Sequence, residues 1–121
     1  MAEKTARETV VRILDQAVES MADPLTPPGC MLTLSAINCS AESASVQQAV
    51  TKARRETELA LRRRIERGIA EGDVPAATDA AALAGFYATF LYGMSIKSLE
   101  GATREQARAL ADAALRAWPA D

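Results

Sequence analysis

The chain has 121 residues, a length that suits one compact domain. Hydrophobic residues make up 49% of it but aromatic residues only 4%, so a core must be built mainly from alanine and aliphatic side chains. Fourteen Lys and Arg against 16 Asp and Glu give a formal net charge of −2. That balance argues against a nucleic-acid-binding surface, which needs clustered positive charge.

The residue types that most enzymes use are scarce. The sequence contains no histidine, which removes the commonest acid–base group and metal ligand. It contains no glycine-rich phosphate loop, and its carboxylates fall on polar helix faces. These features predict a protein that is not an enzyme and that uses no metal or cofactor.

Cys30 and Cys39 are the two cysteines, too few for a disulfide framework. On one helix they would lie roughly 13 Å apart along the axis, whereas bridged cysteines need Cα atoms within about 7 Å. The N-terminus has no apolar signal core, and the uncharged stretch 80–96 is shorter than a membrane span. We therefore expect free thiols, a cytoplasmic location and no membrane partner.

Apolar residues recur at helical spacing along almost the whole chain, which predicts an all-helical domain of about five helices over residues 1–121. The first helix covers about residues 3–21, and the proline-rich segment 23–29 ends it. The apolar segment 30–38 could be a strand by its length alone. We predict a buried helix there, because no other segment offers a partner strand.

A long helix follows from a cap at Ser40 or Ser43 and ends near Glu71, with Gly72 at a left-handed stop. Its basic residues are predicted to form a solvated face, balanced by Glu56, Glu58 and Glu66. These basic residues are Lys52, Arg54, Arg55, Arg62, Arg63, Arg64 and Arg67. Its predicted buried side consists of Val46, Ala49, Val50, Ala53, Thr57, Ala60, Leu61, Ile65 and Ile69.

The next helix, capped by Thr78 or Asp79 and running to about Leu99, is apolar nearly all round. A helix of this kind must be covered on two sides. Small residues four apart allow another helix to approach closely, so we predict that this helix belongs both to the core and to a dimer interface. The alternative is a central helix of one protomer's core. The small residues are Ala81, Gly85, Thr89 and Gly93.

The last helix begins with a capping box at Thr103 and is predicted to run to Trp118, before Pro119. Its stripe is rich in alanine and ends in the single tryptophan, a residue enriched at interface cores. We assign this stripe to the dimer interface, although Trp118 could instead seal the end of the protomer. The stripe consists of Ala107, Leu110, Ala111, Ala114, Leu115 and Trp118.

The order of these signals resembles the C-terminal domain of TetR-family transcriptional regulators over almost the whole chain. The segments that carry the resemblance are 28–32 (PGCML), 38–40 (NCS), 70–75 (AEGDVP), 92–95 (YGMS) and 101–105 (GATRE). The resemblance implies an effector-binding domain whose last two helices form a four-helix bundle with a second copy. The family's N-terminal helix-turn-helix is absent from this chain, so DNA would be bound only through a presumed missing domain.

The same resemblance implies a pocket for a small apolar or aromatic effector, with Thr57 and Tyr87 as polar groups among apolar walls. The lining residues expected from it are Met31, Leu34, Thr57, Leu61, Phe86, Tyr87 and Phe90. Two other functions stay open. The chain could be a stand-alone helical homodimer with a structural or adaptor role, or a thiol-based redox sensor through Cys30, whose expected place in a first helical turn would favour the thiolate.

Overall fold

The computed structural model describes residues 4–22 and 44–120, and in these ranges it contains four α-helices and no strand. They are α1 (Ala6–Ala22), α3 (Ala44–Glu71), α4 (Ala80–Leu99) and α5 (Arg104–Leu115). The all-helical prediction is confirmed. The helix predicted at 30–38 lies outside the described residues.

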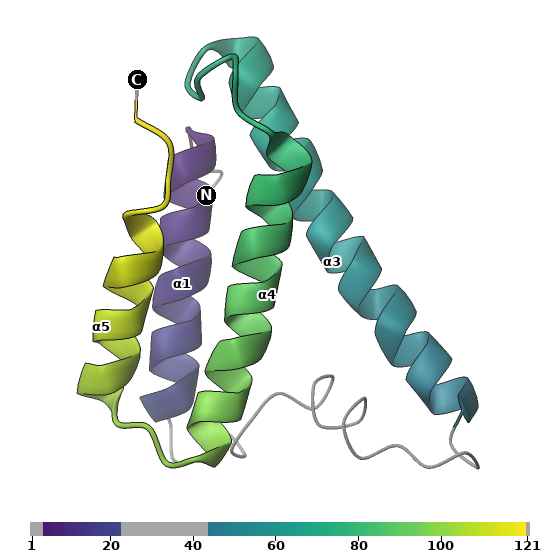
Figure 1. The fold of residues 1–121 in the computed structure, drawn as a ribbon, viewed down its shortest axis with the longest axis vertical. Coiled ribbons are helices and arrows are strands. Elements are labelled where there is room, and N and C mark those ends of the chain that lie inside the picture. Colours follow the sequence, from purple (N-terminus) through teal and green to yellow (C-terminus); the bar gives the residue numbers. More distant parts are fainter. Residues whose placement is uncertain (1–3, 23–43, 121) are drawn as a thin grey trace.

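Three of the helices stand side by side and the fourth leans away from them (Figure 1). Helix α5 packs chiefly against α1, and α3 packs chiefly against α4. From its C-terminal end, where it joins α4 through a short turn, α3 diverges progressively from α1 and α4. The two ends of the described chain lie at the same end of the molecule as this turn.

Side-chain caps fix where the helices begin. Asp79 accepts a hydrogen bond from the Ala82 N–H at 3.0 Å, so it is Asp79 that caps α4. Thr103 and Gln106 form the predicted capping box of α5. The Thr-x-x-Glu sequence of a capping box also opens α1, where the Thr5 hydroxyl accepts from the N–H of Glu8 at 3.1 Å and the Glu8 carboxylate accepts from the N–H of Lys4 at 2.9 Å. Caps of this kind satisfy backbone donors that no helix can satisfy itself.

Two glycines adopt the left-handed conformation between helices. Gly72 has φ of 86° and Gly101 has φ of 84°, values that side chains with a Cβ rarely adopt. Gly72 directly follows the last residue of α3, as predicted from its position in the sequence.

Helix α5 ends three residues earlier than the sequence suggested. Beyond Leu115 the chain continues in tight turns, in which the Trp118 N–H donates to the Leu115 carbonyl at 3.1 Å. The residue before a proline is disfavoured in the α-helical region, so Pro119 disfavours a helical backbone already at Trp118.

The core lies between α1, α4 and α5, with the C-terminal half of α3 covering one side. Its largest fully buried side chains are Tyr87, Leu14, Ile65, Val10 and Val18. At Gly68, a Cβ would lie 3.0 Å from the Ala6 Cβ and 2.7 Å from a methyl group of Val74. Glycine therefore lets α3 approach α1 closely at this point.

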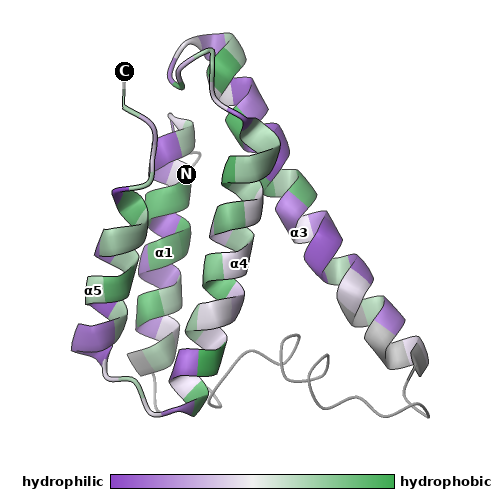
Figure 2. Cartoon of the chain, in the orientation of Figure 1, coloured by the Kyte–Doolittle hydropathy of each residue, from purple (hydrophilic) through white to green (hydrophobic). Residues whose placement is uncertain are grey.

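The outward half of α3 is mostly hydrophilic, whereas α4 is hydrophobic along much of its length (Figure 2). Even so, none of the helices in the described ranges is both long enough and apolar enough to span a bilayer.

Candidate functional site

The residues expected to line an effector pocket do not form one cluster. Leu61 is buried and Phe90 is half-buried against the core. Thr57 is exposed, and its hydroxyl donates to the Ala53 carbonyl of its own helix at 3.0 Å. Phe86 is 43% exposed. Met31 and Leu34 lie outside the described residues, as does Cys30, the residue proposed for a thiol sensor.

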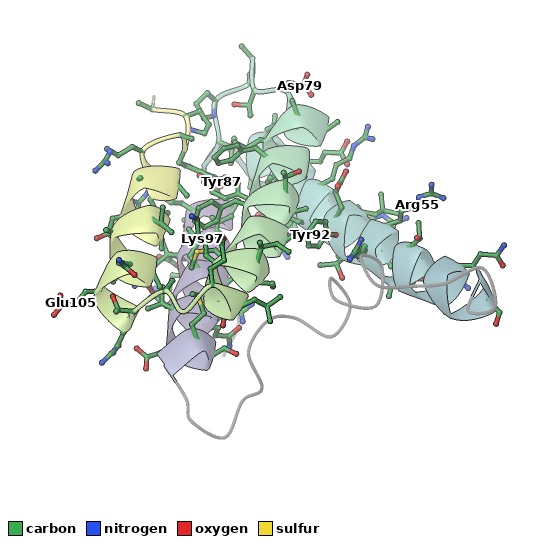
Figure 3. All side chains as sticks on the ribbon, turned by 60° about the horizontal axis from the view of Figure 1, so that its bottom comes forward. Arg55, Asp79, Tyr87, Tyr92, Lys97 and Glu105 are labelled. Carbon is green, nitrogen blue, oxygen red and sulfur yellow. The ribbon has the colours of Figure 1, made fainter. Side chains whose placement is uncertain are left out.

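Tyr87 is a structural link between two helices. Its side chain is 1% exposed, and its hydroxyl donates to the Ala114 carbonyl of α5 at 2.9 Å. The ring contacts Phe86 edge-on at a centroid distance of 4.9 Å and Trp118 at 6.1 Å. Figure 3 shows Tyr87 directed between α4 and α5. Its polar group is therefore already satisfied by the protein.

Burial raises the pKa of Tyr87 to about 12, against an opposing electrostatic effect of the Arg7 charge. Burial disfavours the charged phenolate. The hydroxyl consequently stays protonated and able to donate at neutral pH.

Most of the small residues of α4 remain uncovered within the protomer, whereas a Cβ added at Gly85 would lie 3.8 Å from a carboxylate oxygen of Glu58 on α3. Ala81, Thr89 and Gly93 are exposed, and Gly85 is half-buried. A Cβ added at Gly93 would meet nothing within 4 Å. Together with Phe86, these four residues form the outer face of α4. The opposite, inner face is buried and carries Ala80, Ala84, Tyr87, Ala88 and Met94.

The alanines of α5 lie elsewhere than on the surface. Ala107, Ala111 and Ala114 are buried in the protomer's own core, because this side of α5 packs against α1 and α4. Leu110, Leu115 and Trp118 are half-buried against the same core. Because these three alanines are buried within one protomer, they are not exposed to a second copy of the chain. The exposed small residues in this region are Ala109 and Ala113 of α5 and Ala117 just beyond its end.

A groove of about 660 Å³ lies where α4 turns into α5. Lys97 belongs to its wall, one helical turn beyond Gly93, so the groove continues the direction of the outer face of α4. Its apolar lining comes from Ala102, Ala109 and Leu110. The outer face and the groove therefore make one extended surface that is rich in small residues.

Ion pairs join α1 to α5 on the exposed side of their contact. Arg108 binds Asp15 at 2.6 Å and Asp112 at 3.0 Å, and Arg104 pairs with Glu19. The hydrogen bond to Asp15 is the largest of the causes that raise the pKa of Arg108. Exposed pairs contribute little to stability individually, but these fix α5 beside α1 and leave the other side of α5 outward.

Helices α3 and α4 are held together by a polar contact. The guanidinium of Arg54 lies 5.0 Å from the ring centroid of Tyr92, a distance typical of a cation–π interaction. The Tyr92 hydroxyl in turn donates to the Arg54 carbonyl at 3.3 Å. Tyr92 points toward α3 while Arg55 points away from α4 (Figure 3).

The prediction of a solvated basic face is confirmed for Arg62 and Arg67, which are exposed and pair with Glu66 and Glu71. It is wrong for Arg64, whose side chain is largely buried because it lies on the side of α3 that carries Leu61 and Gly68. Helical periodicity could have placed Arg64 there, since it lies three residues after Leu61 and four before Gly68, a spacing that puts it beside both on the helix surface. Among the described residues, no group of three or more acidic, Cys or His side chains could hold a metal ion.

The helices α1, α3, α4 and α5 form an all-helical domain in the described parts of the chain. Residues 6–115 match the family model described as "Tetracyclin repressor-like, C-terminal domain". The chain therefore belongs to the TetR family through its C-terminal domain.

Relatives of known type agree with this assignment. The HTH-type transcriptional repressor ComR of Escherichia coli (strain K12) is 30% identical over 94 residues, which are 78% of this chain and 45% of that protein. A cysteine-substituted TetR-family regulator CifR, solved with a 26-base-pair operator DNA, superposes with a TM-score of 0.91. It is 38% identical, and the match covers 97% of this chain and 61% of that one.

A third relative, a TetR-type regulator from Rhodococcus sp. RHA1, is 30% identical with a TM-score of 0.81. The match covers 99% of this chain and 64% of that structure. This chain thus spans between 45% and 64% of the length of these relatives.

Proposed function

We propose that this chain is the effector-binding and dimerisation domain of a TetR-like transcriptional repressor that acts in the cytoplasm. In this proposal the domain binds a small ligand with an apolar or aromatic body. DNA is contacted by a part of the full protein that this chain does not include. The relatives support this view, since one is named a repressor and another was solved on operator DNA.

The observation that carries the proposal is the contrast between the two faces of α4. Its inner face is buried by the protomer, and its outer face is equally poor in charge yet lies open. An apolar surface of this kind on a soluble domain indicates a site of association. A second copy of the chain can cover it through a symmetric contact, in which α4 packs against its own counterpart.

Small side chains suit such a contact. Without bulky groups at Gly85, Thr89 and Gly93, two α4 helices can approach closely, with ridges of one helix packed into grooves of the other. The groove at the α4–α5 turn extends the surface onto α5 through Ala109 and Leu110. Stable interfaces bury about 800 Å² on each partner, and we therefore expect α4 and α5 of both copies to take part, as a four-helix bundle.

The effector would bind on the side of α4 that faces α3, away from the dimer surface. There α3 diverges from α4 (Figure 1), with Leu61 of α3 as an apolar candidate for its wall. A ligand that favours one angle between these helices shifts the population toward one arrangement of the dimer. The size of this shift is limited by the ligand's difference in affinity for the two arrangements.

The dimer is tested by sedimentation equilibrium at micromolar concentration, where the mass should be about twice the 12.9 kDa of one chain. Gly93→Leu should weaken this dimer, because overpacking an interface typically costs about 1–3 kcal/mol. The protomer has open space at Gly93, so the variant's helical content should not change. Ala70→Leu is the matched control, since Ala70 is exposed on α3, on the side opposite to the buried Leu61 and away from α4.

A chain that stays monomeric at all concentrations would contradict the interface. So would a Gly93→Leu variant whose dimer constant equals that of Ala70→Leu.

A stand-alone dimer with a structural or adaptor role remains the second candidate. The bond between Tyr87 and Ala114 favours it, because that hydroxyl is not available to orient a ligand. Small aromatic and aliphatic compounds, both neutral and acidic, separate the two functions. A compound that binds the native domain raises its melting temperature by mass action, whereas an adaptor should respond to none of them.

A further inference from the structure

One positive charge on α3 is buried without adequate compensation. The side chain of Arg64 is 14% exposed. Its two terminal nitrogens, Nη1 and Nη2, are inaccessible to solvent and have no hydrogen-bond partner within the described parts of the chain. Its ion pair joins Nη1 to Glu71 Oε1 at 3.9 Å, too long for a hydrogen bond.

That single ion pair is weak for two reasons. The Glu71 side chain is 47% exposed and hence solvated, and its Oε1 is bound more closely by Arg67 at 3.2 Å. A buried guanidinium is costly unless its donors are satisfied by hydrogen bonds or a close opposite charge. Arg64 thus differs from Arg62 and Arg67, which keep their charges near the solvent.

Arg64 lies at the narrow end of the space between α1 and α3, where the charged end of a ligand held between these helices would be placed. It lies one turn before Gly68, whose Cα faces Ala6 of α1, so Arg64 is on the α1-facing side of α3. Thr57 lies seven residues earlier, two turns along nearly the same face. From Arg64 toward Thr57, α3 diverges from α1 (Figure 1). Arg64 therefore lies where the two helices converge, and Thr57 where they are farther apart.

We propose that Arg64 binds the carboxylate group of the effector, which makes the effector an organic acid with an apolar body. This inference rests on the proposed effector-binding function and adds the charged group that the ligand must carry. The two free terminal nitrogens present parallel donors that match the two oxygens of a carboxylate. Leu61 lies three residues before Arg64 and Ile65 directly follows it. Both are buried apolar residues that can contact the body of the ligand beside these nitrogens.

Matched acids and amides test this assignment in the full chain by thermal shift and titration calorimetry. The probes are phenylacetate with phenylacetamide and octanoate with octanamide, at constant ionic strength. The acids should raise the melting temperature and the amides should not. Loss of a charge-assisted pair should weaken acid binding about ten- to hundredfold in Arg64→Met. Arg63→Met, an exposed neighbour on the same helix, should bind the acids like the unmodified chain.

Two further measurements keep the outcome unambiguous. Without ligand, Arg64→Met should unfold at no lower urea concentration than the unmodified chain, because the substitution removes an uncompensated charge. Arg64→Lys keeps the charge but not the paired donors, and should retain part of the preference for acids.

Several outcomes would overturn the assignment. They are the absence of any shift with the acids, amides that bind as well as the acids, and an acid preference that persists in Arg64→Met. If neutral compounds stabilise the chain and acids do no better, the effector-binding function stands and the role of Arg64 fails.

Discussion

The two faces of α4 have similar compositions and opposite environments. On the inner face, alanines and Tyr87 are covered by the protomer, and the tyrosine hydroxyl is bound to a carbonyl of α5. On the outer face, a Cβ added at Gly93 would meet nothing within 4 Å, and Phe86 is 43% exposed. An apolar helix therefore contains two separate surfaces, one that stabilises the fold and one that is available to a partner.

The difference shows how each face should respond to substitution. A change on the inner face acts on the free energy of unfolding, because it alters contacts inside one chain. A change on the outer face acts on association and leaves the protomer nearly unaffected.

The largest expected effect is that of Tyr87→Ala compared with Phe86→Ala. Removing a buried aromatic ring typically costs about 3–5 kcal/mol of unfolding free energy, and here the substitution also removes the side-chain hydrogen bond to the Ala114 carbonyl, which keeps only its bond from the Ala117 N–H. Phe86→Ala should cost much less, because its ring is partly exposed, but it should weaken the dimer. Urea unfolding and sedimentation equilibrium of both variants check this. Equal losses of unfolding free energy would show that the faces are not distinct.

Much of the fold could be predicted from the sequence because local signals determine it. The helical period, Asp79, the Thr103 box and Gly72 each act within one turn of the chain. The box at Thr5 has the same kind of local signal, but the expectation that the first helix starts near residue 3 concealed it.

What could not be predicted depends on the relative placement of whole helices. The expected buried side of α3 is exposed at Ala49, Thr57 and Ala60, because α3 diverges from the other helices there (Figure 1). Ala107 and its neighbours on α5 could face either α1 or a partner by sequence alone. For the candidate site, periodicity identified the outer face of α4, whereas the burial of Arg64 follows from the close approach of α3 to α1 at Gly68.

A second, smaller effect distinguishes two helical glycines. Gly68→Ala should cost about 1–3 kcal/mol, the range typical of overpacking, because its Cβ would lie 2.6 Å from a carboxylate oxygen of Asp73 and 2.7 Å from Val74. Gly93→Ala meets open space, so it should stabilise the protomer by up to about 1 kcal/mol through helix propensity. Thermal unfolding of the two variants measures both signs. A neutral Gly68→Ala would mean that the turn after α3 relaxes freely.

The smallest effect isolates one hydrogen bond on the inner face. Tyr87→Phe keeps the ring and removes the hydroxyl that donates to Ala114, which should cost about 1 kcal/mol at neutral pH.

The pKa of Tyr87 is raised from 10.0 to about 12 in the folded chain. Below pH 10 the phenol is protonated in both the folded and unfolded states, so its contribution to stability is fully present. Between pH 10 and 12 the unfolded chain loses the proton first, and the contribution falls as the pH rises. The stability difference between the unmodified chain and Tyr87→Phe should therefore decrease from pH 9 to pH 11 in urea unfolding. Other alkaline titrations affect both chains equally, so a difference that stays constant over this range would show that Tyr87 is not held protonated by the fold.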